Sequence, residues 1–157
     1  MNSKLTYLGL GSNLGDRYAL IRQALCLLEE RVGRIAACSS LIETEPWGFK
    51  SDHPFINAVV ALRTELSARD LLLATQQIEC ELGRQQKSTR PAPVSDADSP
   101  ALPQYADRPI DVDILLYGDE HIDTDITDNE GALRRLTVPH PLMQQRDFVM
   151  RPLREIR

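Results

Sequence analysis

Two aspartates in a strand-like segment are the residues of this chain best suited to chemistry. Asp111 and Asp113 alternate with apolar residues in the run IDVDILLY, residues 110–117. Residues two apart in a β-strand point to the same side, so the two carboxylates would stand together, with Cα atoms about 6–7 Å apart. Like charges on one face repel unless a cation lies between them, and Mg²⁺ prefers carboxylate oxygens. The pattern favours a magnesium site; the alternative is an edge strand with solvated acids.

Basic residues flank these aspartates in the sequence. Arg84 and Arg108 precede them, and Arg135, His140 and Arg146 follow. A guanidinium group binds phosphate oxygens through two parallel hydrogen bonds, which suits it to polyphosphate. Taken singly, an arginine is more often a solvated surface residue. A polyphosphate site is therefore predicted only where these residues converge on the aspartates.

Other patterns exclude several kinds of site. The glycines of GLGSNLG, residues 9–15, are spaced one residue off the dinucleotide-binding motif, and no Gly-Lys-Ser/Thr follows them. No nucleophile motif is present, which argues against covalent catalysis. Cys26, Cys38 and Cys80 form no CxxC pair. We expect them to be buried free thiols in a reducing cytosol.

Two residues stand out because of their surroundings. Trp47 lies in the polar turn TEPWGF, residues 44–49, where it would either cap the core or close over a flat ligand. Asn57 lies inside the apolar run FINAVVAL, residues 55–62. Its buried amide needs hydrogen-bond partners, which would be either the backbone or the edge of a heterocycle.

Length and composition predict one ordinary globular domain, residues 1–157. The chain is 42% hydrophobic and 26% charged, with a formal net charge of −5. No apolar run approaches the ~20 residues of a membrane span, and no signal segment opens the chain. An acidic chain is also a poor candidate for non-specific duplex binding. We therefore expect a cytoplasmic monomer that binds neither membrane nor nucleic acid.

The predicted elements that position these residues alternate in type. Asn13 and Ser67 are predicted N-caps, and Gly33 and Gly83 are predicted to end the two helices. The expected strands span residues 4–10, 34–44, 55–65 and 110–117. In the last strand, one face would carry four apolar side chains: Ile110, Val112, Ile114 and Leu116. The order βαββαβ predicts an α+β sandwich whose mostly antiparallel sheet carries helices on one face.

Two segments fall outside that alternation. The stretch from about 85 to 107 is rich in proline and polar residues and predicts a long mobile loop. Residues 118–138 predict a polar hairpin, and a short helical C-terminus from Pro141 completes the chain as an appendage.

Six segments together resemble the 6-hydroxymethyl-7,8-dihydropterin pyrophosphokinase family. They occur in family order and cover nearly the whole chain: YLGLGSNLGDR (7–17), TEPWGF (44–49), FINAVVAL (55–62), QQIECELGR (76–84), RPIDVDILLYG (108–118) and LTVPHPLMQQRDFVMRPLREI (136–156). The resemblance implies a ferredoxin-like α+β fold. It also implies transfer of pyrophosphate from ATP to the pterin hydroxymethyl group, leaving AMP, in folate biosynthesis.

The resemblance also implies roles for individual residues. Asp111 and Asp113 would hold two Mg²⁺ ions against the phosphates of ATP, and Arg84 and Arg108 would be catalytic with them. The residues expected to contact ATP are Gln76, Arg84, Arg108, Ile114, Arg135, Thr137, His140 and Arg146. The residues expected to bind the pterin are Thr44, Pro46, Trp47, Phe55, Asn57 and Phe148.

Two other functions fit the same residues. A metal-dependent phosphohydrolase would use the aspartates and arginines to activate water instead of the pterin hydroxyl. A non-catalytic ferredoxin-like binding module would carry the aspartates as a surface edge. The products discriminate the three: AMP formed only with the pterin indicates transfer, free phosphate indicates hydrolysis, and no turnover indicates the module.

Overall fold

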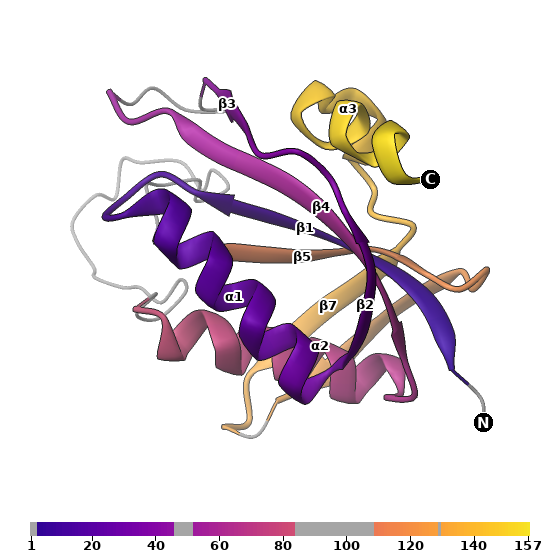
Figure 1. Cartoon of the computed structure of the whole chain (residues 1–157). Helices are drawn as coiled ribbons and strands as arrows, with labels where there is room; N and C mark the ends of the chain where they lie inside the picture. Colours follow the sequence, from indigo (N-terminus) through magenta and orange to yellow (C-terminus); the bar gives the residue numbers. More distant parts are fainter. Residues whose placement is uncertain (1–2, 46–51, 84–108, 129) are drawn as a thin grey trace, which may run out of the picture.

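A five-stranded antiparallel sheet forms the centre of the computed structural model, which describes residues 3–45, 52–83, 109–128 and 130–157. Its order is β2-β4-β1-β5, and β3 pairs with β4 (Figure 1). The strands are β1 (Lys4–Ser12), β2 (Gly33–Cys38), β3 (Ile42–Thr44), β4 (Phe55–Thr64) and β5 (Asp111–Tyr117).

The single strand expected over residues 34–44 is in fact two, β2 and β3. The chain departs from a regular ladder between them at Ser39, whose Oγ accepts a hydrogen bond from the amide of Val59 at 2.9 Å. The same hydroxyl donates to the carbonyl of Ser40 at 2.9 Å. A serine side chain that bonds the backbone competes with strand pairing, which explains the break.

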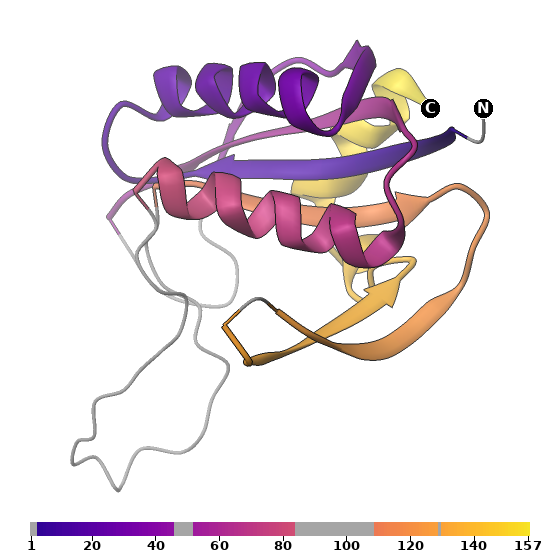
Figure 2. The same ribbon diagram turned by 90° about the horizontal axis from the view of Figure 1, so that it is seen from below.

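Two helices, α1 (Arg17–Arg31) and α2 (Ala68–Glu81), pack on one face of the sheet, as predicted (Figure 2). A third helix, α3 (Asp147–Ile156), covers the opposite face. Each face accordingly has its own apolar cluster. Ile21 of α1 and Ile78 of α2 belong to the first, and Val149 of α3 belongs to the second.

The helix caps agree with expectation at α2 and differ at α1. Ser67 caps α2 by accepting from the amide of Asp70 at 3.1 Å, and Gly83 follows with φ +106°. The cap of α1 is Asp16, which accepts from the amide of Ala19 at 3.1 Å. The prediction of Asn13 was wrong, because its side chain donates instead to the carbonyl of His53 at 3.0 Å.

Strand β5 also departs from simple alternation. Its register with β1 shifts by one residue, so that Tyr7 pairs with Leu116 and Leu8 pairs with Ile114. Leu115 is the extra residue of this bulge, and both Leu115 and Leu116 belong to the cluster under α3. The prediction that Leu116 shares a face with Ile114 was therefore wrong, because a bulge breaks the two-residue period.

The polar segment after β5 folds into a two-stranded hairpin, as predicted. Its strands are β6 (Ile122–Thr127) and β7 (Leu133–Val138), and a short 3₁₀ turn, Met143–Gln145, leads from them to α3. All three cysteines are free and exposed, so the expectation of buried thiols was wrong. No helix within the described part of the chain is both long enough and apolar enough to span a membrane.

Candidate active site

Asp111 and Asp113 lie half-buried on β5, opposite two glycines of β1. The register pairs Asp111 with Gly11 and Asp113 with Gly9. Neither glycine carries a side chain, so Leu115 lies over Gly9, and Asn57 and Phe55 lie over Gly11. Among the described residues, no cluster of three or more potential ligating side chains occurs. Two carboxylates fit Mg²⁺ nonetheless, since that ion commonly keeps water and substrate phosphate as its other ligands.

A narrow cavity of about 60 Å³ opens on the same side of the sheet, and we call it the aromatic cavity. It brings together seven of the residues predicted from the sequence: Thr44, Phe55, Asn57, Asp111, Asp113, Arg146 and Phe148. Phe55 comes from β4 and Phe148 from α3, so the two rings reach the cavity from opposite layers.

Asn57 is the buried amide of the aromatic cavity, with only 5% of its surface exposed. Its side-chain nitrogen donates to Oγ1 of Thr44. Thr44 lies on the neighbouring strand β3 and lines the same cavity. The hydroxyl of Thr44 is thus a partner of this amide besides the two that the sequence left open, the backbone and the edge of a heterocycle.

Arg17 holds the two chain segments that bring these residues to the cavity. One of its nitrogens, Nη1, lies 3.0 Å from the carboxylate of Glu43 and 2.9 Å from the carbonyl of Pro54. Glu43 immediately precedes Thr44, and Pro54 immediately precedes Phe55. The first turn of α1 therefore holds the start of β4 against β3, a role that was not predicted for Arg17.

Arg146 is buried in the wall of the aromatic cavity, where 8% of its surface is exposed. Its guanidinium carbon lies 5.7 Å from the centroid of the Phe148 ring, a cation–π distance. The sequence placed Arg146 with the residues expected to contact ATP. The structure places it in the wall of the aromatic cavity, which the two aspartates also line.

A second cavity of about 400 Å³ lies between α2, β5 and β7, and we call it the polar cavity. It brings together five residues predicted to contact ATP: Gln76, Ile114, Arg135, Thr137 and His140. Asp113 lines this cavity and the aromatic cavity alike. The two cavities therefore meet at Asp113.

His140 presents a neutral imidazole to the polar cavity. Burial, reinforced by the positive charge of Arg146 and opposed by Asp111, lowers the pKa of His140 to about 4. The amide of Leu142 donates to Nδ1 at 3.2 Å, which assigns the ring proton to Nε2. At neutral pH His140 is thus a hydrogen-bond donor without charge.

Two aspartates of β6 hold Arg135 in place. Its guanidinium reaches Asp123 at 2.7 Å and Asp125 at 3.2 Å, and these hydrogen bonds raise the pKa of Arg135. Asp123 also accepts from Oγ1 of Thr137 at 3.1 Å. One carboxylate therefore orients two side chains that line the polar cavity.

Glu79 is a cavity residue that sequence reasoning missed. It lies on α2 with 4% of its surface exposed, and its carboxylate accepts from the amide of Val112 at 2.7 Å. An available signal was its position four residues after Thr75 and one after Ile78, on the buried side of an amphipathic helix. Four predicted residues, Pro46, Trp47, Arg84 and Arg108, and the loop over 85–107 lie outside the described residues.

Comparison with known proteins supports the resemblance on which these roles rest. Residues 7–157 match the family model described as 7,8-dihydro-6-hydroxymethylpterin-pyrophosphokinase (HPPK). The chain belongs to this family. A Porphyromonas gingivalis protein named 2-amino-4-hydroxy-6-hydroxymethyldihydropteridine pyrophosphokinase is 49% identical to this HPPK-family chain, over 97% of it and 90% of the relative. The Bacillus subtilis protein of the same name is 38% identical, over 98% and 78%.

Solved structures resemble the fold of this HPPK-family chain. A crystal structure described as HPPK-DHPS in complex with substrates superposes with a TM-score of 0.70 at 14% identity, covering 99% of this chain and 40% of the other. Wild-type HPPK-DHPS from Plasmodium falciparum gives 0.66 at 15% identity, covering 95% and 40%. The chain thus spans about 40% of the length of these larger proteins.

Proposed function

We propose that this HPPK-family chain transfers a pyrophosphoryl group from ATP to 6-hydroxymethyl-7,8-dihydropterin in folate biosynthesis, leaving AMP. The observation that carries the proposal is the position of Asp113, which lines both cavities. A phosphate donor in the polar cavity and an acceptor in the aromatic cavity would meet at the two carboxylates. The polar cavity, at about 400 Å³, lies within the usual range for small-molecule sites.

The aromatic cavity suits a flat heterocycle with polar edges. Phe55 and Phe148 would contact the two faces of a pterin ring, because aromatic rings favour offset stacking. Thr44 and Asn57 offer a hydroxyl and an amide to the ring edge. On the family resemblance, Pro46 and Trp47 would complete this pterin site.

The polar cavity suits a nucleoside triphosphate. Arg135, Thr137 and the Nε2–H of His140 are donors for phosphate oxygens, and a neutral imidazole donates without needing a counter-charge. Gln76 and Ile114 would contact the nucleoside part. On the resemblance, Arg84, Arg108 and Arg146 would add positive charge around the transferred group.

Asp111 and Asp113 would hold two Mg²⁺ ions together with the phosphates of ATP. When bound, these ions would neutralise phosphate charge and lower the pKa of a nearby hydroxyl. The chain's own contribution is to place both carboxylates on one strand, in the wall of the aromatic cavity.

In the transfer itself, one bond forms and one breaks. The pterin hydroxyl oxygen attacks the β-phosphorus of ATP, the bond from that phosphorus to the oxygen bridging the α-phosphate breaks, and AMP leaves with the bridging oxygen. The hydroxyl proton passes to water or to a phosphate oxygen. Positioning and electrostatic stabilisation supply most of the catalysis in reactions of this kind.

One assay tests the proposal against both alternatives. The purified chain is incubated with ATP and MgCl₂, with and without the pterin, and AMP, ADP and inorganic phosphate are quantified. We expect AMP only when the pterin is present, in a one-to-one ratio with pterin diphosphate. Release of inorganic phosphate without the pterin would indicate a phosphohydrolase, and absence of all products would indicate a binding module.

The finer description of the fold is also an inference. The strand order β2-β4-β1-β5 with α1 and α2 on one face supports a ferredoxin-like βαββαβ core, to which α3 is appended. A single domain, a monomeric state, a cytoplasmic location and the absence of nucleic-acid binding stay predictions from the sequence.

A further inference from the structure

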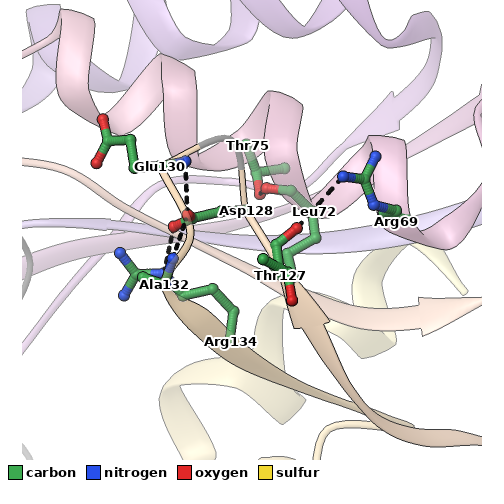
Figure 3. Close-up of polar contacts among 8 residues, drawn as sticks. All are labelled: Arg69, Leu72, Thr75, Thr127, Asp128, Glu130, Ala132 and Arg134. Atoms are coloured by element: carbon green, nitrogen blue, oxygen red, sulfur yellow. Dashed lines mark hydrogen bonds and ion pairs between the residues drawn. The ribbon is translucent and has the colours of Figure 1, made fainter.

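The tip of the β6–β7 hairpin lies against the first half of α2. Arg69, in the first turn of that helix, donates from Nη2 to the carbonyl of Thr127 at 3.3 Å. Figure 3 shows this contact beside Leu72 and Thr75, which follow Arg69 along the helix. The hairpin tip is therefore fixed to α2 at a definite position.

Asp128 organises the turn at this tip and holds one arginine. Its carboxylate accepts from the amides of Glu130 and Ala132, both at 2.9 Å (Figure 3). Its second oxygen lies 3.1 Å from Nε of Arg134. The Asp128 side chain is only 9% exposed, whereas that of Arg134 is 31% exposed. The ion pair thus anchors the inner end of the guanidinium while its outer end stays accessible.

Arg134 lines the polar cavity at the end away from the aspartates. The α2 residues along the cavity run from Leu72 to Glu79, and Glu79 binds the amide of Val112, the neighbour of Asp113. Seven helical residues span about 10 Å. Arg134 pairs with Ile126, one residue from the Thr127 that Arg69 holds. Arg134 and the carboxylate pair therefore lie at opposite ends of the cavity.

From this arrangement we infer that Arg134, held by Asp128, binds the nucleoside end of the nucleotide. The inference rests on the proposed function, since it takes the polar cavity as the nucleotide site. With triphosphate at the aspartates, base and ribose must point toward the hairpin. Leu72 and Leu136 supply apolar lining there. The terminal guanidinium nitrogens suit the ribose hydroxyls and ring nitrogens as donors.

The test measures the affinities of the full chain for three probes, which differ in whether they contain the nucleoside end of the nucleotide, the phosphate end or both. α,β-Methylene-ATP resists cleavage at the bond broken by transfer, AMP keeps the nucleoside, and inorganic tripolyphosphate keeps only phosphates. We expect Arg134→Gln to lower the affinities for α,β-methylene-ATP and for AMP by a similar factor, roughly fivefold to twentyfold. Binding of magnesium tripolyphosphate should stay within about twofold of the unaltered protein.

Three variants separate a direct contact from a change in the hairpin. Arg69→Gln removes the other arginine at the tip, which is not in the cavity lining, and should bind all probes as the unaltered protein does. Asp128→Asn keeps an oxygen for the turn amides but loses the charge opposite Arg134, so an intermediate loss is expected. Arg134→Lys keeps the charge without the planar group and should lose part of the affinity. Thermal unfolding of each variant checks that it folds.

Distinct results overturn the inference. Unchanged nucleotide affinity in Arg134→Gln would overturn it, as would weaker tripolyphosphate binding, which would indicate a phosphate contact. An equal loss in Arg69→Gln would show that hairpin docking matters and Arg134 does not. If the unaltered protein binds no nucleotide and forms no AMP, the proposed function fails together with the inference about Arg134.

Discussion

The backbone of Gly11 lies directly against the side-chain amide of Asn57: a β-carbon built on Gly11 would come within 2.9 Å of Asn57 Oδ1. Ordinary contacts begin at about 3.4 Å, so any side chain at this position must push the amide away. A glycine of β1 thus sets the position of the one buried amide in the aromatic cavity.

Gly11→Ala should therefore impair pterin binding selectively. We expect KM for the pterin to rise about tenfold or more and KM for ATP to change less than about threefold, because Asn57 lies in the aromatic cavity alone. Gly9→Ala is the matched control, since the three atoms nearest to its β-carbon would be Leu115 side-chain atoms at the ordinary contact distances of 3.6–3.7 Å. Steady-state kinetics with each substrate varied gives the comparison, and equal effects of the two variants would contradict the prediction.

Asp111→Asn and Asp113→Asn should each abolish most turnover while the protein stays folded. Asparagine keeps the size of the side chain but removes the charge that a divalent cation needs, so we expect kcat to fall roughly hundredfold or more. Asp119→Asn, an exposed acid just after β5, should retain normal AMP formation. Full activity in both active-site variants would show that the two carboxylates hold no essential metal.

His140 should make stability depend on pH between about 4 and 6.5. Its pKa is lowered from 6.5 to about 4 in the folded chain, mainly by burial. As the pH falls through this window, the unfolded chain binds a proton that the folded chain does not, so the free energy of unfolding decreases. The decrease should total on the order of 1–2 kcal/mol, given partial solvent screening.

Urea unfolding at a series of pH values measures this effect. His140→Gln should flatten the decline between pH 6.5 and 4, because glutamine does not titrate. His121→Gln, which changes an exposed histidine before β6, should keep the profile of the unaltered protein. A decline that persists unchanged in His140→Gln would assign the pH dependence to other groups.

Gly33→Ala should be among the most destabilising single-methyl changes in the chain. A β-carbon at Gly33 would lie 1.9 Å from the backbone carbonyl oxygen of Arg63, and neither strand can move away without breaking the β2–β4 pairing. We expect the free energy of unfolding to fall by about 3 kcal/mol or more. At Gly131, with φ +87° and open space around it, alanine should cost about 1–2 kcal/mol, from backbone strain alone.

Features that depend on local spacing were predictable from the sequence. The two-residue period of a strand was enough to predict that the two carboxylates of β5 lie on one face. The position of Ser67 before an apolar helical stripe was enough to predict it as an N-cap. The bulge at Leu115 was not predictable, because it exists only in the register with β1. Choosing Asp16 over Asn13 as a cap likewise depended on a distant partner, the carbonyl of His53.

The candidate site divides in the same way. Motif resemblance identified most cavity residues, but it could not separate Arg146 from the remaining residues expected at ATP, since that depends on how α3 packs on the sheet. Glu79 and Arg134 were missed because an acid on a helix and an arginine on a hairpin look like surface residues until their neighbours are known.

The bulged residue Leu115 has a second role besides shifting the following residues of β5 to other apolar clusters. Its carbonyl accepts the amide of His140 at 3.0 Å, so the strand that carries the two aspartates also holds the segment that returns from the hairpin. The chain between Leu115 and His140, which includes the β6–β7 hairpin, is thus a loop whose two ends are joined by a hydrogen bond. Residues could be added to or removed from the hairpin without displacing His140 from Asp113. The turn at the hairpin tip could therefore vary in length, whereas strand β7 itself carries Arg135 and Thr137 into the polar cavity.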